Sequence, residues 1–117
     1  MKKKLKLDTV LTNFDGTVIV ENEIPLTLKK ILLEYIGLAH AMNITGPEEF
    51  TLYSIGKKIG KPAGDDFIAL ELQDFNLLKK IVDSGKITVN GQQQPIFKLV
   101  ISQQVRVLLE EVENIKD

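Results

Sequence analysis

The chain has 117 residues, of which 44% are hydrophobic and 26% are charged, proportions typical of one folded domain and not of a disordered protein. Fifteen basic and sixteen acidic residues leave a net charge of −1, so no overall field favours nucleic acid. The absence of cysteine excludes disulfides, thiolate metal sites and cysteine catalysis. We therefore expect a single domain over residues 1–117.

The first eleven residues, MKKKLKLDTVL, carry charge but lack the apolar run of a signal peptide. No window approaches the roughly 18 apolar residues that a membrane span needs. We therefore expect a cytoplasmic protein with no membrane partner. The clustered lysines (Lys2, Lys3, Lys4 and Lys6) are typical of a solvated terminus or a protected edge strand, and they also allow a basic arm that contacts phosphate.

Residues 4–22 predict a β-hairpin at the start of the fold. Apolar and polar residues roughly alternate from Lys4 to Leu11, and residues 17–21, TVIVE, are rich in β-branched side chains. Asp15-Gly16 between the two runs is a strong turn signal, because a turn with positive φ angles tolerates Asp and favours Gly.

The same stretch, NFDGT at residues 13–17, is compared with the Asp-x-Asp-Gly-Thr signature of haloacid-dehalogenase-like phosphatases. In that signature the first carboxylate attacks phosphorus and the second is the general acid and base. Here Asn13 stands at the nucleophile position, and an amide cannot replace a carboxylate in attack or on Mg²⁺. The family's acidic metal motif is also incomplete, because no carboxylate follows Asp65 or Asp66 at the expected short spacing. The roughly fifty residues between the two stretches are too few for the βα units of that fold. We therefore interpret the stretch as a turn.

Residues 28–42 predict the first helix, with Thr27 as its N-cap. Apolar residues recur there at the spacing of one helical face: Leu28, Ile31, Leu32, Tyr35, Ile36, Ala39 and Met42. A second helix is predicted from Pro47 to about residue 59, burying Phe50, Leu52, Tyr53, Ile55 and Ile59. Gly56 inside it costs about 1 kcal/mol relative to Ala, which indicates either tight packing or a weak helix.

The middle of the chain predicts a loop at 60–66, a short strand in FIALEL, and a helix that ends with Gly85 at its C′ position. Residues 59–72 have the layout of an EF-hand. With Ile68 at the central position, however, Asp65 supplies one of the four carboxylates expected, so we do not expect calcium. Residues 86–95 predict a brief extended piece and an Asn90-Gly91 turn.

The last helix is predicted from about Pro95 to Asn114. Its apolar residues step by four and three and form a seam of the a/d type: Phe97, Ile101, Val105, Leu108, Val112 and Ile115. Two interpretations stay open. Either the helix packs on the domain's own helices, or the seam binds a protein partner or a second copy of the chain.

The remaining polar residues do not form a catalytic or metal-binding set. His40 is the single histidine and has no cysteine, second histidine or paired serine with which to form a metal site or triad. We therefore expect no enzyme activity, cofactor or metal. Lys57, Lys58 and Lys61, together with Lys2, Lys3 and Lys4, form the candidate surface for nucleic acid, which we consider the alternative function.

The order of features resembles a group of small proteins encoded by bacteriophages and prophages. The shared features are LDTVL at 7–11, FDG at 14–16, PLTLKKILL at 25–33, DDFIALELQDFNLLKKIV at 65–82 and a closing helix at 95–109. The KITVNGQQQ stretch departs from that group. The resemblance implies a phage-type accessory protein working inside a bacterium, and it implies no substrate.

We thus expect an α+β fold in which an N-terminal hairpin packs on about four α-helices. The expected function is that of a non-enzymatic phage accessory or assembly protein that acts by binding a protein or by self-association. The alternative is an accessory factor that binds nucleic acid.

Overall fold

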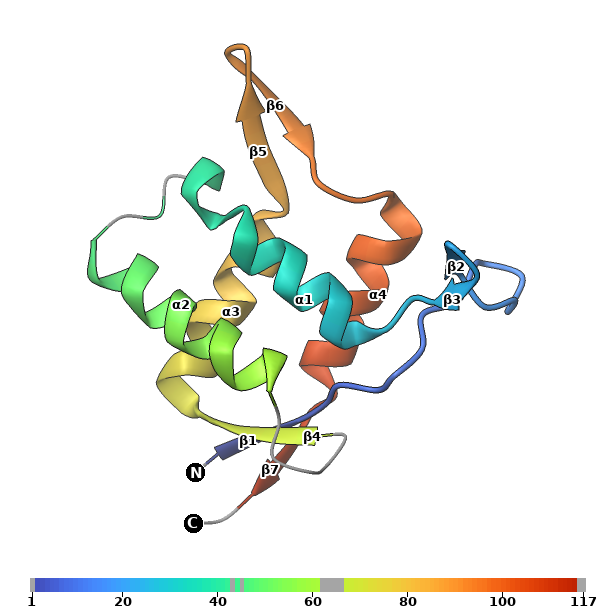
Figure 1. The fold of residues 1–117 in the computed structure, drawn as a ribbon, viewed down its shortest axis with the longest axis horizontal. Coiled ribbons are helices and arrows are strands. Elements are labelled where there is room, and N and C mark those ends of the chain that lie inside the picture. The colour runs from blue at the N-terminus through green and yellow to red at the C-terminus, as the bar shows by residue number, and fades with distance from the viewer. Residues whose placement is uncertain (1, 43, 45, 62–66, 116–117) are drawn as a thin grey trace.

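The computed structural model describes residues 2–42, 44, 46–61 and 67–115. Within these residues lie four α-helices: α1 (Leu28–Gly37), α2 (Pro47–Gly60), α3 (Leu72–Ser84) and α4 (Leu99–Glu110). The strands are short and pair antiparallel: β1 (Lys2–Lys6), β2 (Val20–Glu21), β3 (Ile24–Pro25), β4 (Phe67–Glu71), β5 (Lys86–Val89), β6 (Gln92–Pro95) and β7 (Glu113–Ile115). The α+β class with four helices is confirmed (Figure 1).

The main sheet has three strands in the order β4-β1-β7. The central strand β1 is antiparallel to both neighbours, so that Lys4 lies opposite Ala69 on one side and Glu113 on the other. Leu5 and Leu70 are fully buried, because they point to the face of the sheet that α3 covers. The predicted hairpin over 4–22 is therefore wrong in its pairing, because β1 pairs with the distant strands β4 and β7 and not with residues 17–21. Pairing within the main sheet is what buries Leu5.

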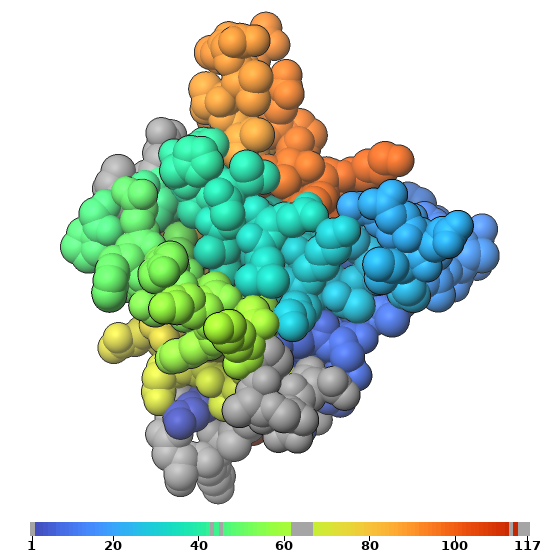
Figure 2. Space-filling model, in the orientation of Figure 1, coloured from blue at the N-terminus to red at the C-terminus, as the bar shows by residue number. Residues whose placement is uncertain are grey.

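Residues 10–27, which we name the N-terminal lobe, form a separate small ladder that projects from the body (Figures 1 and 2). The turn at Asp15-Gly16 is present: the Asn13 amide donates to the Thr17 carbonyl at 2.8 Å, and Gly16 has φ of +88°. The ladder continues through the bridges of Thr12 with Val18 and of Val10 with Thr27, and β2 pairs with β3.

Helix α1 begins as predicted, with the Thr27 hydroxyl accepting a hydrogen bond from the Lys30 amide. The amides of Leu28 and Lys29 donate to carbonyls of residues 9 and 7, which satisfies two donors that a helix start leaves unpaired. The helix ends at Gly37, five residues earlier than predicted, and the chain continues into the 3-10 turn Ala39–Met42. Ala39 and Met42 are nevertheless buried.

Helix α2 packs closely against α1 at Gly56. A Cβ atom at that position would lie 3.4 Å from Cγ2 of Ile36, at the edge of an ordinary van der Waals contact, so the space there is nearly wide enough for alanine. The prediction was right for Leu52, Ile55 and Ile59, which are buried. It was wrong for Phe50 and Tyr53, which are 72% and 61% exposed because they lie on the side of α2 that faces away from α1 and α3.

Helix α3 ends at a left-handed Gly85 with φ of +58°, as predicted, and leads into a two-stranded arm. Strands β5 and β6 meet at the predicted Asn90-Gly91 turn, where both residues have positive φ. The extended piece is longer than expected, because residues 92–95 form the second strand. The arm projects from the body (Figures 1 and 2).

Helix α4 begins at Leu99 and ends at Glu110, so the prediction of a helix from 95 to 114 was too long at both ends. Residues 113–115 instead form β7, which pairs with the edge of β1. The hydrogen bonds of this strand pair replace those that a longer helix would make. Ion pairs join α4 to α3, with Lys79 Nζ 2.7 Å from Glu110 Oε1 and Arg106 Nε 3.1 Å from Asp83 Oδ1.

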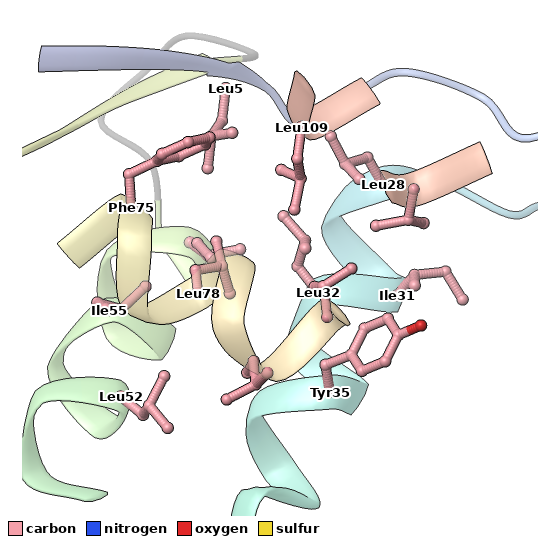
Figure 3. Close-up of a cluster of buried hydrophobic side chains, with 14 of the residues drawn as sticks. Leu5, Leu28, Ile31, Leu32, Tyr35, Leu52, Ile55, Phe75, Leu78 and Leu109 are labelled. Atoms are coloured by element: carbon pink, nitrogen blue, oxygen red, sulfur yellow. The ribbon is translucent and has the colours of Figure 1, made fainter. Parts of the chain in front are cut away.

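The core is one cluster of buried side chains drawn from all four helices, the main sheet and the lobe. Figure 3 shows its centre, where Leu5, Leu32, Phe75, Leu78 and Leu109 point toward one another. Within the described residues it contains no buried charged residue. Tyr35 is fully buried, and its ring meets Phe97 edge to face with the centroids 4.9 Å apart.

Candidate protein-docking surface

The NFDGT stretch is a turn whose polar groups bond to one another. The Asp15 carboxylate accepts hydrogen bonds from Thr17, at 2.6 Å from its hydroxyl and 3.0 Å from its amide. These bonds favour the ionised form and hold the pKa of Asp15 below its ordinary value, the hydroxyl being the larger cause. The Asn13 side chain donates to the Thr17 hydroxyl at 3.1 Å. The stretch therefore stabilises the tip of the lobe.

The predicted seam on the last helix does not form one exposed stripe. Val105 is fully buried, and Phe97, Ile101, Leu108 and Val112 pack partly buried against the core. Val112 lies beyond the end of α4, and Ile115 falls in β7, where its side chain lies outside the described part of the chain. The alternation of three and four therefore belongs largely to a helix face that packs on the core of the same chain.

The candidate lysines already have neighbours in the structure. On β1, Lys2 Nζ lies 3.7 Å from Glu71 Oε1, Lys3 lies over the Phe75 ring, and Lys4 lies 4.3 Å from the centroid of Phe67. Because successive side chains of a strand point to opposite faces, Lys2, Lys4 and Lys6 share the outer face of the sheet, whereas Lys3 points toward α3. The strand therefore places Lys3 on the opposite face from Lys2, Lys4 and Lys6.

The lysines on α2 belong to another element. Lys57 Nζ lies 5.3 Å from the centroid of the Tyr53 ring, Lys58 Nζ lies 3.9 Å from Asp74 Oδ2, and Lys61 follows the last residue of the helix. These are exposed, solvent-screened contacts, which weaken a phosphate-binding surface only slightly. None of the described contacts joins these lysines directly to those of β1, although Lys58 and Lys3 contact adjacent residues of α3, Asp74 and Phe75.

An exposed apolar groove lies between the N-terminal lobe and α4. Residues 12–14 form one wall, and Leu99, Val100, Gln103, Gln104 and Val107 form the other, around a hollow of about 420 Å³. Three large apolar side chains remain in water around it, with Phe14 85%, Leu99 66% and Val107 52% exposed. They come from two segments that lie more than 80 residues apart in the sequence.

Gln104 fastens the lobe to α4 at the base of this groove. Its side-chain oxygen accepts from the Thr12 amide at 3.0 Å, and its side-chain nitrogen donates to the Thr12 carbonyl at 2.9 Å. The amide thus bonds to both backbone groups of one residue, as a neighbouring strand would. The groove therefore has a wall that is held in place by an α4 side chain.

The residues that line the groove carry no formal charge. Its polar groups are the hydroxyl of Thr12 and the amides of Asn13, Gln103 and Gln104. The Gln104 amide is bonded to Thr12, but the exposed Asn13 and Gln103 amides offer donors and an acceptor, so the rim is able to form hydrogen bonds without bringing an ionised group into an interface. An apolar centre with an uncharged, hydrogen-bonding rim is typical of a protein-binding surface.

Elsewhere in the described part of the chain, chemistry-bearing groups are dispersed. His40 is exposed in the 3-10 turn. Within the described residues, no three His, Cys, Asp or Glu side chains are placed together to hold a metal ion. Asp65, the single carboxylate at a ligand position of the rejected EF-hand layout, lies outside the described residues. Among the helices that the structure describes, no helix has the length and apolar character to cross a membrane.

Sequence reasoning missed the groove because its exposed residues follow no local period. Phe14 stands next to the turn residues, and Leu99 and Val107 lie off the a/d seam of the last helix. The useful signal was that Val107 does not lie on the helical face shared by Val105 and Leu108, so it is not buried with them.

Comparison with models of protein families, with curated proteins and with solved structures found no match.

Proposed function

We propose that this protein is a non-enzymatic accessory protein that acts by binding a protein partner through the groove between the lobe and α4. The observation that carries the proposal is the exposure of Phe14, Leu99 and Val107 around one hollow. Scattered exposed apolar residues are normal, but a clustered set with a polar rim marks a site of interaction.

Phe14 is the residue on which the proposal depends most. Aromatic side chains supply much of the binding energy at interfaces, and they do so from positions near the centre of the buried patch. The turn would form as well with a polar residue at position 14, because its hydrogen bonds come from Asn13, Asp15 and Thr17. Binding, and not folding, therefore gives the exposed ring a role.

The cellular setting of the proposal comes from the resemblance to small phage and prophage proteins. It favours an accessory or assembly role in the cytoplasm of a bacterial host. A protein of this kind needs a docking surface and no catalytic groups.

Site-specific photo-crosslinking in cells tests the proposal. A photoreactive phenylalanine analogue replaces Phe14 in one variant and the similarly exposed Phe50 of α2 in the matched control. We expect an adduct with a protein, either another copy or a different chain, at position 14 and in clear excess over position 50. Equal or absent adducts at the two positions would refute protein binding through the groove.

Nucleic-acid binding is the second candidate, and the observation that favours it is the alignment of Lys2, Lys4 and Lys6 on the outer face of β1. A mobility-shift assay over a range of salt concentrations tests it. Phosphate contacts predict binding at low salt that falls steeply as salt rises, and that weakens in a variant with Lys2 and Lys4 replaced by Gln. Absent or salt-independent binding excludes this candidate.

A further inference from the structure

We propose that the occupant of the groove is the groove face of a second copy of this chain, so that two copies pair about a two-fold axis. This inference rests on the proposed function, because it assigns the partner of the same surface. It is argued from the charge, the shape and the area of the groove face.

The charge of the face favours a second copy. In a two-fold interface each patch meets itself, so a charged residue near the axis faces a like charge. The groove is lined by apolar, hydroxyl and amide groups alone, although 26% of the chain is charged. The Gln104 amide is already bonded to Thr12, but the exposed Gln103 amide carries both donors and an acceptor, so it is able to pair with its own symmetry mate. A carboxylate or an ammonium group is not.

The shape of the face is also self-complementary. The Phe14 ring protrudes from the tip of the lobe, 85% exposed, and the hollow of about 420 Å³ lies directly beside it. A two-fold rotation that lays one face on the other places each ring against its partner's hollow. Leu99 and Val107, exposed on the wall of that hollow, then cover the ring. One contact, made twice, removes all three apolar side chains from water.

The exposed area indicates a dimer of modest strength. With about 150–250 Å² for a large side chain, Phe14, Leu99 and Val107 together expose on the order of 350 Å² per copy. This is a little under half of the roughly 800 Å² that each partner buries in a standard interface, so a dimer of standard size would also bury surface outside the groove. We therefore expect dissociation constants in the micromolar range and a mass that depends on concentration.

Sedimentation equilibrium of the purified chain from about 1 μM to 1 mM tests the inference. We expect the mass to rise from 13.1 kDa toward twice that value as concentration increases. Phe14→Ser and Val107→Lys should each raise the dissociation constant by about tenfold or more, because one removes the protruding ring and the other sets like charges against each other. The matched control, Phe50→Ser, removes an exposed ring from α2 and should leave the constant unchanged.

A crosslinking measurement keeps the test independent of any effect of these variants on folding. The chain contains no cysteine, so Gln103→Cys and Gln93→Cys each provide a single thiol, the first at the groove and the second on the exposed arm. With a bifunctional maleimide at micromolar protein, we expect a covalent dimer from Gln103→Cys in excess of that from Gln93→Cys. No excess overturns the two-fold pairing.

The two proposals fail in different ways. A chain that stays monomeric at every concentration, or a dimer that Phe50→Ser weakens as much as Phe14→Ser does, overturns self-association. If the photoreactive residue at position 14 nevertheless captures a different protein in cells, protein binding through the groove stands with another occupant. If it captures nothing, both proposals fall.

Discussion

Gln104 provides the sharpest test of how the groove is built, through the variant Gln104→Met. Methionine keeps the length and helix propensity of the side chain but removes both hydrogen bonds to Thr12, which measure 3.0 and 2.9 Å. A net value of about 0.5–1.5 kcal/mol for each bond gives a loss of about 1–3 kcal/mol in the free energy of unfolding. Because Gln104 is only half-buried and water reaches the freed groups, we expect the lower part of that range.

Urea denaturation measures the global effect, and hydrogen exchange locates it. We expect the Thr12 amide and its neighbours in the lobe to exchange faster, while the amides of α3 keep their protection. The control is Gln103→Met, one residue away and exposed, which should change stability by no more than about 0.5 kcal/mol. If Gln104→Met is as stable as the parent and the Thr12 amide exchanges at the same rate, the two hydrogen bonds of Gln104 do not hold the lobe in place.

The remaining predictions concern the core and the helix ends. Tyr35→Phe should stabilise the protein or leave it unchanged, within about 1 kcal/mol by urea denaturation, because no hydrogen-bond partner of the buried Tyr35 hydroxyl was found in the described structure. Burial raises the pKa of Tyr35 to about 12, so the parent should lose stability as pH rises from about 10 toward 12, where the unfolded chain ionises first, and Tyr35→Phe should lose less. Gly85→Ala should cost about 1–2 kcal/mol in the same assay, because φ is +58° and the added Cβ would lie 3.3 Å from the Val82 carbonyl oxygen. Gly56→Ala should stabilise α2 by up to about 1 kcal/mol, provided that Ile36 gives way slightly at its 3.4 Å contact; a loss of more than 1 kcal/mol would show that it cannot.

The parts of the fold that the sequence predicted well are those that a few adjacent residues determine. Thr27 caps α1, Pro47 begins α2, Gly85 ends α3, and Asn90-Gly91 turns the arm, each through its own backbone geometry or a hydrogen bond close by. The pairing of β1 failed for the opposite reason. Its partners lie at residues 67–71 and 113–115, and no local signal distinguishes them from the nearer TVIVE segment.

The candidate site was hard to predict because it joins two segments in space. The exposure of Phe14 follows from where the lobe leaves the body, and that of Leu99 and Val107 follows from the rotation of α4 about its axis. The rotation is set by which residues the core takes, here Val105 and Leu109. Helical periodicity showed that α4 has an apolar face, and it could not say which apolar residues the core would leave in water.

The place of β1 between β4 and β7 has a consequence for how the chain folds during synthesis. Lys2 pairs with Glu71 and also with Ile115, so β1 leaves the ribosome before both of its neighbours and waits longest for β7. At roughly 5–20 residues per second, that interval lasts on the order of 5–20 s for the hundred-odd residues in between. Throughout it, one edge of β1 stays open to the wrong partner, and a nascent chain stalled before residue 113 could not close it. The pairing of β1 with β7 is thus the last contact of the main sheet that synthesis permits, and the edge that is open until then is a place for mispairing.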